Sequence, residues 1–134
     1  MMRRDAESPK SLIDKLAVKP NARVVVLGVS DEGFLSQLHE RSTDVHFGEA
    51  DGEWDVVFIQ AEDREDLRRL RSLEARIKRN GTIWVVFPRG VRQIREADVF
   101  AAAKAAGLVD VKVVRFSDAH TGLKLVVPLA RRGS

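Results

Sequence analysis

The segment Arg23-Val24-Val25-Val26-Leu27-Gly28 decides the fold of this chain. Its continuous β-branched run is typical of a strand that is buried on both faces of a parallel sheet. The turn over 28–33 follows directly, and the apolar residues after it recur at helical spacing, which predicts a helix over about 31–41. A strand, a glycine-containing turn and a helix in this order open an α/β unit.

The same reading extends to the rest of the chain. It predicts further helices over 9–18, about 63–79 and about 95–106, central strands over 54–59 and 82–87, a short edge strand over 43–47, and an antiparallel pair over 109–117 and 122–128. Ser8 is expected to cap the first helix, and Asn80-Gly81 to end the helix over 63–79. We therefore expect one three-layer, Rossmann-like α/β domain over 8–129, with a mostly parallel sheet and a C-terminal antiparallel β-hairpin. Residues 1–7 are expected to be a disordered N-terminus, and 130–134 a basic, flexible tail.

The edge strand over 43–47 poses a problem of chain length. If it pairs beside the first strand while 54–59 pairs on the other side, the segment Gly48–Glu53 has to cross the sheet. A parallel crossover usually takes a dozen or more residues. Six residues span it only when extended, so this strand is either very short or wrongly placed.

Composition excludes several classes of protein. The chain has 134 residues, enough for one core, and no cysteine, which rules out a disulfide scaffold and a thiolate zinc site. The three histidines, His39, His46 and His120, are too scattered to suggest a metal site, and His120 is expected to be exposed in the hairpin turn. No apolar run resembles a signal peptide or approaches the roughly 20 residues of a membrane span, so we expect a cytoplasmic protein without membrane contact.

Charge is distributed unevenly. Residues 1–66 carry 8 basic and 15 acidic side chains, and residues 67–134 carry 15 basic and 5 acidic ones. Arg68, Arg69, Arg76 and Arg79 would project from the helix over 63–79, away from its leucines. They form either a basic patch for nucleic acid or an acidic partner, or an ordinary solvated helix face.

A family resemblance rests on several short motifs. The run from Leu16 to Gly28 is similar to the helix, turn and first strand of class I S-adenosylmethionine-dependent methyltransferases. The whole of 8–128 resembles a bacterial family of small domains of unknown function related to those enzymes, through Gly33-Phe34-Leu35, Asp55-Val56-Val57, Gly81-Thr82-Ile83-Trp84-Val85 with Pro88, 107–113 and Gly122-Leu123-Lys124. This resemblance implies the strand order 2-1-3-4-6-5 and places a possible S-adenosylmethionine site at Gly28, Ser30, Asp31, Gly33 and Glu49.

The departures from the methyltransferase pattern concern the cofactor cradle. Val26 stands where those enzymes usually have an acidic residue, and Ser30 stands where a middle glycine is expected. Glu49 is the only acidic candidate for the ribose. The helix and strand that normally contribute adenine contacts are missing between Phe47 and Trp54.

The acidic turn at 30–32 limits the class of ligand. Asp31 and Glu32 lie where a helix N-terminus would otherwise attract a phosphate, so an NAD or ATP site is disfavoured, whereas the sulfonium of S-adenosylmethionine is not. Alternatively, Ser30 or Asp31 only caps the helix. Gln60, Pro88 and Arg89 form a second candidate ligand edge at the ends of two further strands.

No catalytic residue is assigned. The leading hypothesis is a reduced methyltransferase-like domain without methyl-transfer activity that acts as a ligand-binding or protein-interaction module. The alternative is an S-adenosylmethionine-binding methyltransferase whose cradle is completed by oligomerisation, such as a homodimer. A second alternative is a nucleic-acid-binding module that uses the arginine-rich second half.

Overall fold

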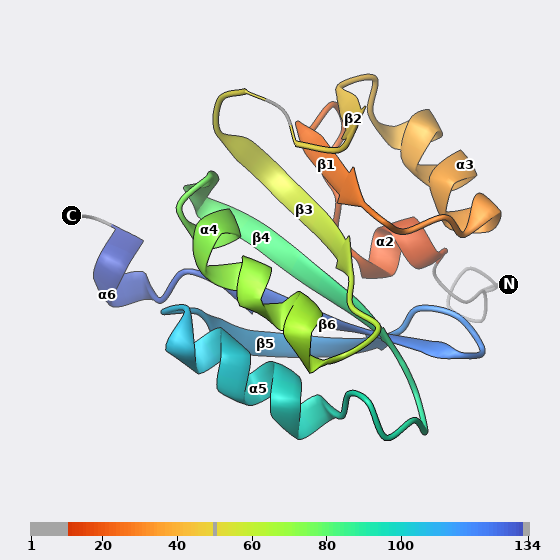
Figure 1. Cartoon of the computed structure of the whole chain (residues 1–134). Coiled ribbons are helices and arrows are strands. Elements are labelled where there is room, and N and C mark those ends of the chain that lie inside the picture. The colour runs from red at the N-terminus through yellow and green to blue at the C-terminus, as the bar shows by residue number, and fades with distance from the viewer. Residues whose placement is uncertain (1–10, 50, 133–134) are drawn as a thin grey trace, which may run out of the picture.

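The computed structural model describes residues 11–49 and 51–132. A six-stranded sheet runs through the molecule, and helices cover both of its faces (Figure 1). The elements in chain order are α2 (Leu12–Lys15), β1 (Val24–Leu27), α3 (Glu32–Arg41), β2 (Val45–Phe47), β3 (Trp54–Gln60), the 3-10 helix η1 (Arg64–Arg69), α4 (Leu70–Glu74), β4 (Ile77–Pro88), α5 (Glu96–Ala105), β5 (Val109–Arg115), β6 (His120–Val126) and α6 (Leu129–Arg132).

The strand order is β2-β1-β3-β4-β6-β5, which confirms the predicted order and the α/β fold class. The β2, β1, β3 and β4 strands are parallel neighbours, whereas β6 runs antiparallel to both β4 and β5. The carboxyl ends of the parallel strands therefore meet at one edge of the sheet, beside the turn that joins β5 to β6.

The β2 strand is present and very short. Its three residues pair in parallel with Val24, Val25 and Val26, so the edge strand predicted over 43–47 is correctly placed but reduced. The β2 and β3 strands pair with opposite sides of β1, so the chain crosses the sheet between Phe47 and Trp54 (Figure 1). An extended chain rises about 3.3 Å per residue, so six residues reach roughly 20 Å, enough to cross two strand spacings and return to the start of β3.

The helix predicted over 63–79 is wrong in its second half. Asp63 caps η1, α4 ends at Glu74, and β4 already begins at Ile77. Ile77 continues the leucine spacing, but it pairs with Trp54 as a strand residue. The Arg79 guanidinium donates to the Glu74 carbonyl over 2.8 Å, which gives the end of α4 a hydrogen-bond partner. Asn80-Gly81 lies inside β4 and ends no helix.

Several other element ends differ from the prediction. Ser11 caps α2, which is shorter than the helix expected over 9–18 because Ala17 adopts a left-handed backbone with φ of 57°. The first hairpin strand begins at Val109 as predicted but already ends at Arg115, and the second is shifted two residues towards the N-terminus, since β6 spans His120–Val126. The α6 helix occupies part of the stretch expected to be a tail. The expected cap Ser8 and the segments 1–7 and 133–134 lie outside the described residues.

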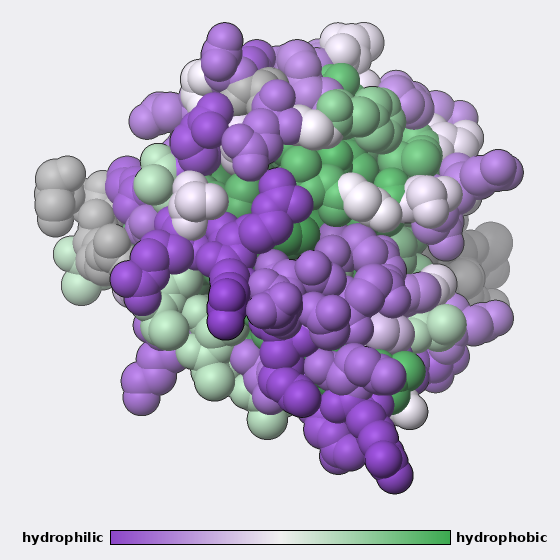
Figure 2. All heavy atoms as spheres, viewed as in Figure 1, coloured by the Kyte–Doolittle hydropathy of each residue, from purple (hydrophilic) through white to green (hydrophobic). Residues whose placement is uncertain are grey.

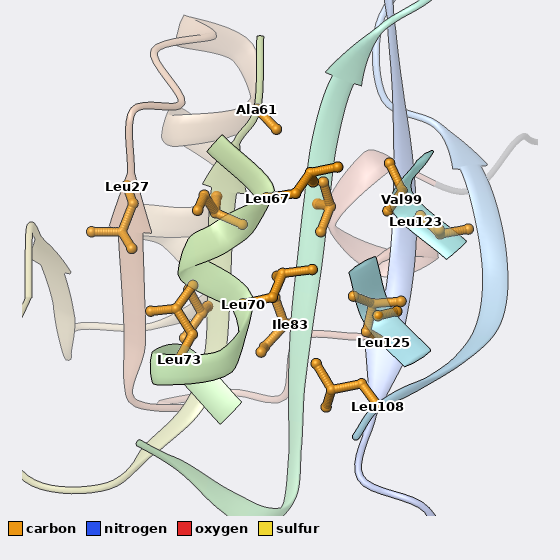
Figure 3. Close-up of a cluster of buried hydrophobic side chains, with 14 of the residues drawn as sticks. Leu27, Ala61, Leu67, Leu70, Leu73, Ile83, Val99, Leu108, Leu123 and Leu125 are labelled. Carbon is orange, nitrogen blue, oxygen red and sulfur yellow. The ribbon is translucent and has the colours of Figure 1, made fainter. Parts of the chain in front are cut away.

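The core is divided by the sheet into two layers. One layer lies beneath η1, α4 and α5 and includes Trp54. Figure 3 shows Leu67 and Leu70 of this layer pointing towards β4, with Ile83 beside Leu70. The other layer lies beneath α2 and α3 and includes Trp84, whose indole N–H donates to the Leu16 carbonyl over 3.2 Å. Both tryptophans are fully buried. Among the described residues, no helix has both the length and the apolar character needed to span a membrane.

Candidate functional site

An open hollow of about 520 Å³ lies at the carboxyl edge of the sheet. The turn after β1 forms one wall, and the end of β3 and the β5–β6 turn form the others. Its lining residues are Gly28, Val29, Ser30, Asp31, Gln60, Glu62, Phe116, Ser117 and His120. Open α/β sheets bind ligands at this edge, because loops from several strands converge there.

Gln60 and His120 close the hollow from two different strands. Gln60 Nε2 lies 3.0 Å from His120 Nε2, and the same amide donates to the Glu62 carboxylate. His120 Nδ1 lies 3.3 Å from the Ser117 hydroxyl. The expectation of an exposed turn histidine is wrong, because His120 is the first residue of β6, where it pairs with Pro88 and is half-buried. Sequence reasoning missed this contact because the hairpin was placed too late in the chain.

Gly28 sits where the groove needs backbone without a side chain. Its φ is 87°, and a Cβ atom there would lie 3.3 Å from Gln60 Cβ. A larger residue would therefore be strained and would crowd the end of β3.

A second hollow of about 600 Å³ adjoins the first on the side of β2. It shares Gly28, Val29, Ser30 and Gln60 with the first hollow, and it adds Val26, Leu27, Phe47, Gly48, Glu49 and Arg69. Figure 2 shows apolar surface in the upper part of the view, where Figure 1 has β1 and β2, and hydrophilic side chains surround it. The two hollows together form what we call the edge groove, an elongated depression that passes over Gly28.

The residues of the predicted turn have separate roles. Asp31 caps α3, since its Oδ1 accepts from the Phe34 N–H over 2.9 Å, although it also faces the first hollow. Ser30 is exposed and lines both hollows. Gly33 lies in the first turn of α3 and lines neither of them. The structure thus brings Gly28, Ser30 and Asp31 together at the groove and leaves Gly33 outside it.

Glu49 lines the second hollow, but both of its carboxylate oxygens face arginines. Arg69 Nη2 lies 3.2 Å from Oε2, and Arg76 Nη1 lies 3.5 Å from Oε1. The Arg76 guanidinium in turn stacks 4.6 Å from the centre of the Trp54 ring. These contacts fasten the crossover 48–53 to the layer of η1 and α4.

The second predicted ligand edge comprises Gln60, Pro88 and Arg89, and the β5–β6 turn separates Gln60 from the other two. The Arg89 N–H donates to the Ala119 carbonyl over 2.8 Å, and its guanidinium donates to the Asp118 carbonyl. Arg89 therefore fastens the hairpin turn. Pro88 and Arg89 line a different hollow of about 460 Å³, so they do not join Gln60 in the edge groove.

The predicted basic helix face does not form. Arg68 and Arg69 lie in η1, Arg79 lies in β4, and Arg76 lies between α4 and β4. Several of them have acidic partners: Arg68 lies 3.7 Å from Glu65, and Arg79 lies 3.0 Å from Glu74. Within residues 11–49 and 51–132, no three histidine or acidic side chains cluster in a way that could hold a metal ion.

A family model matches residues 14–129, which is most of the chain. The chain belongs to the family described as protein of unknown function (DUF3052). No curated protein is a detectable sequence relative. Family membership confirms the resemblance seen in the sequence.

Solved structures of methyltransferases share the fold. A S-adenosylmethionine-dependent methyltransferase from Aquifex aeolicus superposes with a TM-score of 0.66 at 13% identity, covering 87% of this chain and 88% of that chain. The fibrillarin pre-rRNA processing protein of Methanococcus jannaschii gives a TM-score of 0.62 at 11% identity, covering 90% and 70% of the two chains. Magnesium protoporphyrin IX methyltransferase from Synechocystis PCC 6803, solved with bound S-adenosylmethionine, gives 0.57 at 14% identity, covering 87% and 74%. This member of the family therefore has a methyltransferase-like fold.

Proposed function

We propose that this protein is a small-ligand-binding module that holds its ligand in the edge groove and transfers no methyl group. The single observation that carries the proposal is the junction of the two hollows over Gly28. An elongated ligand can cross this glycine and contact Ser30 on one side and the apolar end of β2 on the other. Asp31 and Glu62 make the first hollow unfavourable for phosphates, so the ligand class we test is S-adenosylmethionine and its product S-adenosylhomocysteine.

The residues present fit this class only in part. The acidic turn suits a sulfonium-bearing nucleoside. The carboxylate that would bind ribose hydroxyls does not fit, because Glu49 is engaged with Arg69 and Arg76. Ligand sites usually bury most of the ligand surface, and the described residues between β2 and β3 form no helix or strand that could cover the groove near Phe47. Methyl transfer depends on tight positioning, which an open groove of this kind does not supply.

Isothermal titration calorimetry with both compounds tests the proposal. We expect weak binding, with a dissociation constant above about 100 µM, because the nucleoside end is poorly covered. Ser30→Trp should abolish the heat of binding, since it fills both hollows from an exposed position. Ser72→Trp on the exposed side of α4 is the matched control and should bind like the wild type. No binding at millimolar concentration, or binding unchanged by Ser30→Trp, would show that the proposal is wrong.

A working methyltransferase is the second candidate, favoured by the likeness to structures solved with S-adenosylmethionine. It requires Glu49 to leave its arginines and hold the ribose. If the protein is a methyltransferase, the dissociation constant for S-adenosylmethionine should be about micromolar, and Glu49→Gln should raise it at least about tenfold. Our proposal predicts that Glu49→Gln leaves the affinity within about twofold, which separates the two functions in one titration series.

A further inference from the structure

The β5 strand forms one end of the sheet and presents apolar side chains to solvent. Among the strands of residues 11–49 and 51–132, it pairs with β6 alone. Val109, Val111 and Val113 are 40%, 53% and 52% exposed, and they are three of the five large hydrophobic residues that are exposed in the described part of the chain. An open strand edge of this kind is a template for pairing with another strand.

Two oppositely charged side chains, Asp110 and Arg115, lie near the two ends of β5 on the same face of the sheet. Asp110 pairs with Leu125, and Arg115 pairs with Thr121; Val113 between them pairs with Leu123. Residues directly opposite each other point to the same face, and Leu123 and Leu125 belong to the α5 side of the core. Asp110, Val113 and Arg115 therefore share that face. Asp110 and Arg115 are exposed, and neither forms an ion pair with any residue of 11–49 or 51–132.

The usual protections of an edge strand leave most of β5 open. Lysines and bulges commonly prevent edge pairing. Lys112, however, lies on the opposite face, where its ammonium donates to the Lys15 carbonyl over 3.1 Å. The register shift lies between Asp110 and Lys112, so 112–115 runs as a regular strand.

We propose that β5 is a homodimer interface, in which the β5 strands of two copies pair antiparallel with Val113 opposite Val113 of the partner subunit. In this register Arg115 lies opposite Val111 of the partner subunit, at the register shift between Asp110 and Lys112. The shift puts Asp110 on the same face as Val113 and Arg115, so Asp110 of the partner subunit lies beside Arg115, and the two-fold axis repeats the contact. Parallel pairing would instead bring like charges together, which destabilises a strand pair. The charge pattern is thus complementary to itself, which favours a second copy over an unrelated partner, and the two sheets join into one.

Sedimentation equilibrium over about 1 µM to 1 mM tests the interface. The average mass of the wild type should rise towards twice the monomer value as concentration increases. Val113→Lys should remain monomeric, because it sets two ammonium groups opposite each other at the axis. Phe47→Lys is the matched control: Phe47 is 58% exposed on the opposite edge strand, so this variant should dimerise like the wild type. A wild type that stays monomeric, or dimers lost in Phe47→Lys and kept in Val113→Lys, would overturn the proposal.

Charge reversal tests the pairing of Asp110 with Arg115. Asp110→Arg alone and Arg115→Asp alone should each raise the dissociation constant about tenfold or more, because like charges then meet twice. An equimolar mixture of the two variants should recover dimers of wild-type strength, since every contact is again between opposite charges. Failure of the mixture to recover while both variants keep their circular dichroism spectra would show that this register is wrong.

A cysteine cross-link locates the two-fold axis directly. The chain has no cysteine, so Val113→Cys introduces one thiol per subunit. Directly opposite residues bring their Cβ atoms to about 5 Å, close to the geometry of a disulfide. We expect Val113→Cys to form covalent dimers under mild oxidation, and Val109→Cys, far from the axis, to form few. Equal cross-linking at both positions would contradict the proposed register.

Discussion

The carboxylate of Asp55 accepts a hydrogen bond from the Arg23 N–H over 2.8 Å, which ties the start of β3 to the residue before β1. Its other oxygen lies 2.9 Å from the Lys78 ammonium on β4. One side chain thus links three neighbouring strands at the amino edge of the sheet. The edge groove lies at the opposite edge, so Asp55 contributes to stability and does not contact the groove.

Asp55→Asn should lower the free energy of unfolding by about 1–2 kcal/mol at neutral pH, because the hydrogen bond to Arg23 weakens and Lys78 loses its partner. Burial by itself would raise the pKa of this carboxyl, but the Arg23 N–H and the Lys78 ammonium, with the charge of Lys19, hold the pKa below 3.8. Its contribution is therefore complete above that value and is lost as pH falls through the lower folded pKa. Urea unfolding of both proteins measures it, and the difference should shrink in acid. A difference that is constant with pH would contradict this account.

Lys124→Gln should stabilise the protein slightly. Burial, and then the neighbouring charge of Lys112 across the strand pair, lower the pKa of Lys124 below 10.5. The protonated form is thus disfavoured by folding throughout the neutral range, and this cost disappears as pH rises through the folded pKa. We expect a gain below about 1 kcal/mol by urea unfolding, decreasing at alkaline pH. Lys104→Gln on exposed α5 is the control and should show no comparable gain.

Gly81→Ala should be strongly destabilising, by about 2 kcal/mol or more. A Cβ atom at this position would lie 2.9 Å from the Lys78 carbonyl oxygen and 3.1 Å from those of Trp54 and Asp55, all of which belong to the backbone. Asn80→Ala, the exposed neighbour, should be close to neutral and serves as the control. Thermal and urea unfolding measure both variants. A mild effect of Gly81→Ala would indicate that β3 and β4 do not approach closely here.

Nucleic-acid binding should be weak in this protein, because acidic side chains lie close to Arg68, Arg69, Arg76 and Arg79. We expect fluorescence anisotropy with short DNA and RNA oligomers to show no salt-dependent binding near physiological ionic strength. Binding that strengthens steeply as salt is lowered from that point, and that falls on Arg68→Ala, would favour the nucleic-acid reading.

The sequence predicts the central strands well because each of them is encoded by a short run of neighbouring apolar residues. Val24–Leu27 and Val56–Ile59 are continuous apolar stretches, whereas the order of the strands in the sheet was implied by the family resemblance. The boundary at Ile77 could not be found in this way, because a leucine spacing of three or four carries on into β4 without a break. Periodicity does not tell a helix residue from a strand residue that happens to continue the spacing.

The candidate site was predictable only where it depends on backbone. Gly28 and Ser30 follow a strong strand, and their place at the carboxyl edge follows from the fold. The contact of Gln60 with His120 joins residues 60 positions apart, and it depends on the register of the β5–β6 hairpin. The pairing of Glu49 with two arginines likewise depends on how the crossover 48–53 lies against η1, which no local pattern encodes.

The division of the core into two layers gives each layer its own optical reporter. Trp54 and Trp84 are the two tryptophans of the chain, and they lie on opposite sides of the sheet. Replacing either one by phenylalanine leaves a single indole whose emission reports the solvent exposure of one layer alone. Loss of structure beneath α2 and α3 can then be followed separately from loss of structure beneath α4 and α5, in real time and without an attached dye.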